Sequence, residues 1–249
     1  MIRYKKKYIR FYEELNDFLP DDKKKTRIEH QFIDRTSVKD LIESMGVPHT
    51  EIDMVLVNGK SVSFDCIIND KDDISVYPVF ETFDITEVQH LRPLPLRDPK
   101  FVCDVHLGKL AKNLRMIGID SDYKNNYTAR EIVNISLNER RTILTRDPGL
   151  LKRSEVTHGY FVRNSIPLEQ TKEIVTRFQL QNNINEFSRC IECNSKLVET
   201  EKDKIIHRLP KRISKAHDDF YLCSECNKIY WKGSHFDNML LKLKLIMED

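Results

Sequence analysis

Two aspartates in this chain stand where carboxylates could bind a divalent metal ion. Asp104 follows an apolar, β-prone run at residues 101–103, and Asp147 closely follows a second such run at residues 142–145. If the two strands are neighbours in a parallel sheet, their carboxyl ends lie at one edge, where such sheets bind ligands. Magnesium and manganese prefer carboxylate oxygens. The sequence therefore predicts a metal site at this edge, with Asp104 and Asp147 as its Mg²⁺ or Mn²⁺ ligands.

A third carboxylate strengthens this prediction. Glu131 falls in the first turns of a predicted helix, from where it could point back to the strand ends, and Asp120 and Asp122 are further candidates. A lone aspartate at a strand end is more often a helix N-cap than a metal ligand, so capping is the alternative for Asp104. Taken together, Asp104, Glu131 and Asp147 favour a catalytic site.

Basic side chains surround these acids and suggest a phosphate backbone as substrate. Contacts between Lys or Arg and phosphates give an affinity that is sensitive to salt and independent of base sequence. A structural ion pair with a core carboxylate is the alternative for each of them. His106, two residues after Asp104, is expected to pack on the first helix, with a position near the metal as the alternative. The predicted substrate-binding residues are Lys109, Arg115, Arg146, Lys152 and Arg153.

Four of the six cysteines form two C-x-x-C pairs, separated by 29 residues. Two such pairs supply the four thiolates of a tetrahedral structural zinc site, and their spacing is typical of a zinc ribbon. A redox dithiol is the weaker alternative, because two pairs are more than that chemistry needs. A closed site with four thiolates leaves no open position for catalysis. The predicted zinc ligands are Cys190, Cys193, Cys223 and Cys226.

Strands and helices alternate over residues 100–182, which predicts an α/β domain with a parallel sheet and helices on both faces. The first helix spans residues 106–117 and ends at Gly118, with Lys109, Lys112 and Arg115 off its apolar face. Thr128 is expected to cap the next helix. Residues 188–249 follow as the cysteine-rich region, with a mostly extended insert between the pairs, and an amphipathic C-terminal helix.

The first 85 residues read as strand, strand, helix, strand, strand, with Ser37 as N-cap of the helix and Gly46 as its stop. This α+β order resembles the β-grasp fold of small ubiquitin-like sulfur carriers. No Gly-Gly follows Phe80, so the region is expected to be a non-conjugating ubiquitin-like module that binds a protein or serves as a scaffold. A proline-rich linker spans residues 86–99.

The motifs FVCDVHLGKLAKNLRMIGID, TILTRDPGLLKR and YLCSECNKIYWKGSH closely resemble the Mut-seven C-terminal RNase family. This resemblance implies a PIN-like, Rossmann-like three-layer nuclease fold followed by a zinc ribbon, and an N-terminal ubiquitin-like domain. It also implies ribonuclease activity with Asp104, Glu131 and Asp147 as the acids. Family members often carry a run of aspartates before the position of Glu131. At residues 124–128 this chain instead has the sequence KNNYT, without an aspartate.

Charge and composition bound the remaining possibilities. Residues 1–85 hold 13 Lys/Arg against 17 Asp/Glu, whereas residues 86–249 hold 28 against 22, so the second part is the better candidate for a polyanion partner. The chain has no apolar stretch of about 18 residues and no secretory h-region, so a cytoplasmic protein is expected. The best prediction is a metal-dependent ribonuclease acting on single-stranded RNA. The alternatives are an RNA-binding protein with weak or no catalysis, and an adaptor.

Overall fold

A computed structural model describes residues 5–32, 35–78, 91 and 99–247 of the chain. The chain divides into two compact units. The first consists of the described part of residues 1–97 together with residues 147–161, and the second of residues 98–146 and 162–249. The segment that follows Arg146 thus groups with the N-terminal unit. The predicted linker at 86–99 and the predicted strand end at 79–80 lie almost wholly outside the described residues.

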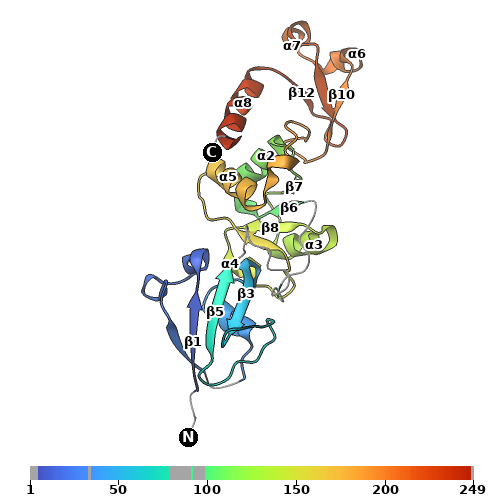
Figure 1. Cartoon of the computed structure of the whole chain (residues 1–249). Coiled ribbons are helices and arrows are strands. Elements are labelled where there is room, and N and C mark those ends of the chain that lie inside the picture. Colours follow the sequence, from blue (N-terminus) through green and yellow to red (C-terminus); the bar gives the residue numbers. More distant parts are fainter. Residues whose placement is uncertain (1–4, 33–34, 79–90, 92–98, 248–249) are drawn as a thin grey trace. The chain divides into compact units, whose positions relative to one another are not determined.

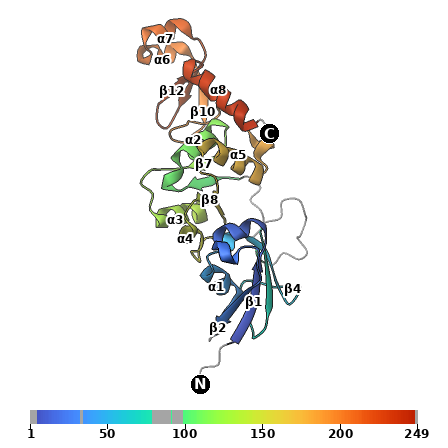
Figure 2. The same ribbon diagram turned by 90° about the vertical axis from the view of Figure 1, so that its left-hand side faces the viewer.

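The first unit is built on a five-stranded mixed sheet with the order β2-β1-β5-β3-β4 (Figures 1 and 2). The central strands β1 and β5 run parallel, and the other pairs are antiparallel. The turn between β3 and β4 contains Asn58 and Gly59, both with positive φ, as the Asn-Gly signal predicts. The strands are β1 (Lys5–Phe11), β2 (Ile28–Phe32), β3 (Ile52–Val57), β4 (Lys60–Ser61) and β5 (Asp73–Pro78).

The helix α1 (Val38–Ser44) buries its apolar side against this sheet. The Ser37 hydroxyl accepts a hydrogen bond from the N–H of Asp40, which satisfies one donor of the first turn, and Gly46 follows the helix with a φ of 108°. Both predicted helix boundaries are confirmed. The core joins α1 to the strands through Ile9, Phe11, Leu41, Ile42 and Val55.

Residues 147–161 supply two further elements to the first unit, α4 (Pro148–Leu151) and β9 (Gly159–Phe161). A 3₁₀ turn, η3 (His49–Glu51), precedes β3 and lies against β9. The other 3₁₀ turns of this unit are η1 (Glu13–Phe18) and η2 (Asp21–Lys23).

The second unit contains a parallel sheet in which β6 (Phe101–Cys103) lies between β7 (Ser121–Asp122) and β8 (Thr142–Thr145). The helices α2 (Gly108–Met116) and α5 (Pro167–Arg177) pack together on one side of the sheet, and α3 (Ala129–Glu139) packs on the other (Figures 1 and 2). The strands β6 and β8 are fully buried, as expected for strands covered on both faces, and β7 buries its first residue. The predicted alternation of strands and helices is confirmed.

Two glycines shape the ends of α2. Gly118 has a φ of 86°, and a Cβ there would lie 2.1 Å from the carbonyl oxygen of Asn185. The glycine that was predicted to end the helix therefore also permits a close approach of the Asn185 backbone. Gly108 begins the helix, and a Cβ there would lie 2.6 Å from the Tyr123 hydroxyl. A short 3₁₀ turn, η4 (Val105–Leu107), connects β6 to α2.

The cysteine-rich region of the second unit is a three-stranded antiparallel sheet with the order β10-β11-β12. The prediction of a mostly extended insert between the cysteine pairs was wrong, because two short helices and a 3₁₀ turn follow β10. The elements are η5 (Leu180–Asn183), β10 (Leu197–Thr200), α6 (Lys202–Ile205), η6 (Ile206–Arg208), α7 (Lys211–Ala216), β11 (Phe220–Cys223), β12 (Ile229–Trp231) and α8 (Ser234–Met247). Within the described residues, none of the helices is long and apolar enough to cross a membrane.

Candidate functional site

Asp104 lies at the carboxyl edge of the parallel sheet, directly after β6. Its side chain is 8% exposed. Oδ1 accepts a hydrogen bond from the N–H of Val105 at 2.6 Å, and Oδ2 accepts one from the Thr145 hydroxyl, at the end of β8, at 2.7 Å. Asp104 is therefore the N-cap of η4, as the capping alternative predicted. Each carboxylate oxygen has a second lone pair, so capping leaves the group able to bind a cation.

Asp122 ends β7 near the same edge. It pairs in register with Val102 of β6, two residues before Asp104. Its Oδ1 accepts from the N–H of Tyr123 at 2.9 Å and its Oδ2 from the Tyr127 hydroxyl at 2.8 Å. Burial and the hydrogen bond to Asp122 raise the pKa of the Tyr127 phenol, which therefore remains a donor. The parallel register, rather than the residue pattern, identifies Asp122 as a second carboxylate of this edge.

Glu131 is held at the start of α3 by a capping box with Thr128. Its Oε2 accepts from both the N–H and the hydroxyl of Thr128 at 2.7 Å, and the same hydroxyl accepts from the N–H of Glu131 at 3.3 Å. These hydrogen bonds hold the pKa of the Glu131 carboxyl below its ordinary value. The cap at Thr128 is confirmed. The contacts of Glu131 account for its position, and its predicted catalytic role stays a prediction.

Asp147 belongs to the first unit and is the N-cap of α4. Its Oδ1 accepts from the N–H of Gly149 at 2.8 Å, and Pro148 occupies the first helical turn, where a free N–H is not needed. The side chain is exposed to solvent. Asp147 thus has the same capping role as Asp104, and its predicted role as a metal ligand stays a prediction.

The predicted acids do not form a dense cluster. Within the described part of the chain, the only group of three or more His, Cys, Asp or Glu side chains with ligand atoms within 4.8 Å of one another consists of the four paired cysteines. A magnesium ion usually keeps several waters and needs only one or two carboxylates from the protein. The carboxyl edge at Asp104 is compatible with such a sparse site.

An open groove of about 920 Å³ begins directly after Asp104. Its walls carry the exposed lysines Lys109, Lys112 and Lys124, together with several polar side chains. The acid Glu192 also lines it and pairs with Lys112 at 3.3 Å. His106 is exposed and faces this groove, so the expectation that it packs on the helix was wrong. The excess of positive charge makes the groove suitable for an anionic chain.

Arg115 does not fit its predicted contact with substrate phosphates. The side chain is 1% exposed, and its guanidinium donates to the carbonyls of Ser121 at 2.8 Å, Ile191 at 3.0 Å and Glu192 at 2.8 Å. Although the helical pattern placed Arg115 off the apolar face, backbone carbonyls take up its donors. Arg115 is a structural residue that joins α2 to β7 and to the first cysteine pair.

The other predicted phosphate contacts are distributed over both units. Arg146 donates through Nη1 to the carbonyls of Val162, Arg163 and Asn164, so part of its guanidinium supports the backbone after β9. Lys152 is half-buried and Arg153 exposed just after α4, in the first unit. Lys109 lies in the groove.

The four cysteines converge at the base of the antiparallel sheet. The Sγ atoms of Cys190 and Cys226 are 3.5 Å apart, and those of Cys193 and Cys223 are 3.3 Å apart. The two C-x-x-C pairs lie in turns of the same kind. In each turn an asparagine with positive φ (72° for Asn194 and 57° for Asn227) follows the second cysteine and donates its N–H to the carbonyl of the first. The sequence signal is the repeated pattern C-x-E-C-N. This arrangement could hold a tetrahedral metal ion such as zinc.

Comparison with protein families matches residues 99–243 to the Mut7-C RNAse domain and residues 5–84 to the Mut7-C ubiquitin domain. The first match covers more than half of the chain. The chain belongs to the Mut7-C RNAse domain family. Comparisons with curated proteins and with solved structures give no significant match. The Mut7-C RNAse domain therefore contains the carboxyl edge, the basic groove and the cysteine cluster described above.

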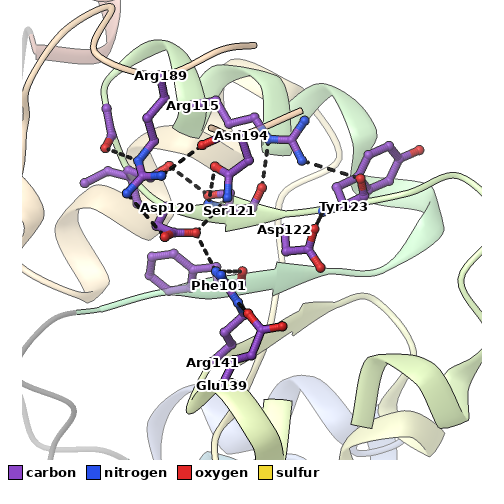
Figure 3. Close-up of polar contacts among 12 residues, drawn as sticks. Phe101, Arg115, Asp120, Ser121, Asp122, Tyr123, Glu139, Arg141, Arg189 and Asn194 are labelled. Atoms are coloured by element: carbon purple, nitrogen blue, oxygen red, sulfur yellow. Dashed lines mark hydrogen bonds and ion pairs between the residues drawn. The ribbon is translucent and has the colours of Figure 1, made fainter. Parts of the chain in front are cut away.

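A buried polar network connects the cysteine cluster of the Mut7-C RNAse domain to β7 (Figure 3). The Asp120 carboxylate accepts from Arg141 at 2.5 Å and from the Asn194 amide at 2.7 Å, and pairs with Arg189 at 3.2 Å. Asn194, which follows Cys193, also accepts from the N–H of Ser121 at 3.0 Å. Asp120 is thus a structural residue at the opposite end of β7 from Asp122, a distinction that residue type alone cannot make.

Proposed function

We propose that the protein is a metal-dependent ribonuclease that hydrolyses phosphodiester bonds of single-stranded RNA. The observation that supports this most is the buried Asp104 carboxylate at the carboxyl edge of a parallel sheet, beside a groove of exposed lysines, in a Mut7-C RNAse domain. RNA phosphates would lie along the groove, with Lys109 as a contact. Lysine contacts of this kind bind the backbone without reading its sequence.

In this proposal, Asp104 and Asp147 hold a magnesium or manganese ion, and Glu131 is the third acid. Bound there, such an ion lowers the pKa of a water molecule and offsets charge on the phosphodiester. The Thr145 hydroxyl fixes the orientation of the Asp104 carboxylate by its hydrogen bond to Oδ2. The four paired cysteines hold a structural zinc ion, whose closed ligand set keeps it out of the reaction.

Asp104→Asn tests this function cleanly. Asparagine caps a helix about as well as aspartate does, so the substitution preserves the capping role of Asp104. It removes the charge and places an amide NH2 opposite the Thr145 hydroxyl, which can accept from it. We expect Mn²⁺-dependent cleavage of a labelled single-stranded RNA to fall at least roughly 100-fold, because the metal loses an anionic ligand. Asp218→Asn, at a side chain that is 90% exposed, is the control and should cleave normally. Equal cleavage by Asp104→Asn and the unmodified protein would contradict the site.

The second candidate is an RNA-binding protein without efficient catalysis, which could also act as an adaptor through its ubiquitin-like domain. The capping box of Glu131 favours it, because that contact alone explains the residue. Glutamine serves equally well in a capping box. Cleavage retained by Glu131→Gln would remove Glu131 from the catalytic set. If the unmodified protein binds RNA in a salt-sensitive manner but does not cut it with Mn²⁺ or Mg²⁺, the second candidate holds.

A further inference from the structure

Hydrogen bonds to His49 and Glu51 attach the segment that begins with Asp147 to the ubiquitin-like part of the first unit. The Glu51 carboxylate accepts from the N–H of Phe161 at 2.7 Å. The His49 ring lies with Nε2 2.8 Å from the carbonyl oxygen of Val156, and with Nδ1 2.6 Å from the Glu43 carboxylate. Since a carbonyl only accepts, Nε2 carries the proton in the first contact. Both groups come from η3 and reach residues more than 100 positions later in the chain.

Packing around these hydrogen bonds excludes water. The Glu51 side chain is only 4% exposed and Val156 only 1%. The rings of Phe18 and Phe161 meet edge to face, with centroids 5.1 Å apart. Gly159 permits the close approach, because a Cβ at this position would lie 3.7 Å from that of Thr50 and 2.5 Å from a Leu151 methyl group.

The energetic weight of the Glu51 contact follows from its burial. A buried carboxylate that loses its hydrogen-bond donors, or a buried N–H that loses its acceptor, destabilises the fold by the full cost of its desolvation. A short segment such as residues 147–161, whose own elements are four and three residues long, cannot be fixed by local structure alone. Besides the strand pairing of β9, its conformation therefore depends on the side chains that bind it.

We propose that His49 and Glu51 are positioning residues for the Asp147–Phe161 segment, and that the ubiquitin-like domain thereby serves as an internal support of the nuclease site. The proposal rests on the proposed function only in that Asp147 is a metal ligand. The contacts of His49 with Val156 and of Glu51 with Phe161 hold the C-terminal end of the segment. The cap formed by Asp147 holds its N-terminal end. The ubiquitin-like domain then needs no separate protein partner to affect catalysis.

The test compares Glu51→Ala with Glu51→Gln in the full-length protein. Glutamine keeps an oxygen that can accept from Phe161, whereas alanine removes it. We expect amide exchange in residues 152–161 to accelerate at least about fivefold in the alanine variant and to stay near normal in the glutamine variant. For RNA cleavage, kcat should fall about 10-fold with KM little changed in the alanine variant, because a displaced ligand affects the reacting geometry more than phosphate binding.

Glu29→Ala is the matched control, since Glu29 is an exposed residue of β2 in the same sheet whose carboxylate pairs with Lys6 at 2.8 Å. It should change neither exchange in the segment nor kcat. If Glu51→Ala does not fold, His49→Leu and the donor-retaining His49→Gln replace the pair with the same expectations. Unchanged exchange in residues 152–161 in both Glu51→Ala and His49→Leu would overturn the positioning role. Altered exchange in a protein that never cleaves RNA would support positioning and refute the nuclease proposal.

Discussion

At the residue scale, Asp104 combines a helix cap with a carboxylate that faces the candidate site. Its two oxygens are held by different partners, the N–H of Val105 and the hydroxyl of Thr145. The first bond is local and depends only on the turn after β6. The second joins the ends of two neighbouring strands and fixes the side chain in one orientation. Thr145 is therefore the residue whose loss should separate the capping role from the metal-binding role.

Thr145→Val removes the hydroxyl while keeping the side-chain shape. We expect unfolding in urea to show a loss of about 1.5–3 kcal/mol, because a charged acceptor loses a hydrogen bond in a buried place. RNA cleavage and the apparent Mn²⁺ affinity should fall roughly 10- to 100-fold, as for other groups that orient a metal ligand. Thr145→Ser retains the hydroxyl and should remain close to normal. A valine variant with unchanged Mn²⁺ dependence would exclude this orienting role.

At the element scale, the two-residue strand β7 is held by contacts beyond its backbone pairing with β6. Asp120, just before β7, accepts from Arg141 and Asn194, and the carbonyl of Ser121 accepts from Arg115. So short a strand has little stability of its own, and these side chains fix its register. The position of Asp122 at the carboxyl edge depends on that register.

Asp120→Asn should destabilise the protein by about 1.5–3 kcal/mol at pH 7, because the half-buried Arg189 loses its anion and the buried Arg141 keeps only the half-exposed Glu139. Burial opposes ionisation of Asp120, but the hydrogen bonds from Arg141 and Asn194 outweigh it and hold its pKa below the ordinary 3.8. A pKa that is lowered by folding contributes stability at every pH above the ordinary pKa. This stability is lost only as the pH falls through the pKa of the folded state.

The stability difference between Asp120→Asn and the unmodified protein should therefore stay constant from pH 8 to about pH 5.5. Urea unfolding at several pH values in this range measures it. Asp218→Asn, at an exposed ion pair, should change stability by less than about 0.5 kcal/mol. A difference that shrinks already between pH 7 and pH 6 would show that Asp120 titrates there and that the network is not ionic.

At the scale of the whole molecule, the cysteine cluster and the parallel sheet belong to one compact unit rather than to separate domains. The first cysteine turn contacts β7 directly, since Asn194 bonds to both Asp120 and Ser121, and Arg115 bonds to the carbonyls of Ile191 and Glu192. Metal binding by cysteines generally contributes folding free energy. Loss of the metal should therefore destabilise the parallel sheet as well as the cysteine-rich antiparallel sheet.

Removing the metal with a chelator should release one zinc ion per chain and increase amide exchange in residues 188–200 and 220–231. Exchange should also increase in residues 120–123, because their contacts with Asn194 and Arg115 loosen. Peptides from residues 38–57 serve as the internal control and should not change. Cys193→Ser should reproduce the effect, whereas Cys66→Ser, outside the cluster, should retain zinc. Chelation that loosens only the ribbon would show that the network does not couple the two regions.

Local patterns predicted most of the secondary structure. Ser37, Thr128 and Gly118 mark helix boundaries correctly, because caps and positive φ depend on the residue and its immediate neighbours. The helices α6 and α7 were missed, since the charged insert between the cysteine pairs has no clear apolar period. The grouping of residues 147–161 with the first unit also could not be predicted, because it depends on contacts with His49 and Glu51.

The sequence by itself determined the acidic strand ends, the cysteine pairs and the resemblance that the family match confirms, because these depend on residue types at fixed spacings. Only the tertiary structure decided what each polar side chain contacts. Arg115 and Asp120 looked like site residues and are structural, whereas Thr145 looked like part of a buried strand and orients Asp104. The physical reason is that a polar group acts through its partner, and partners distant in sequence are brought together only by the fold.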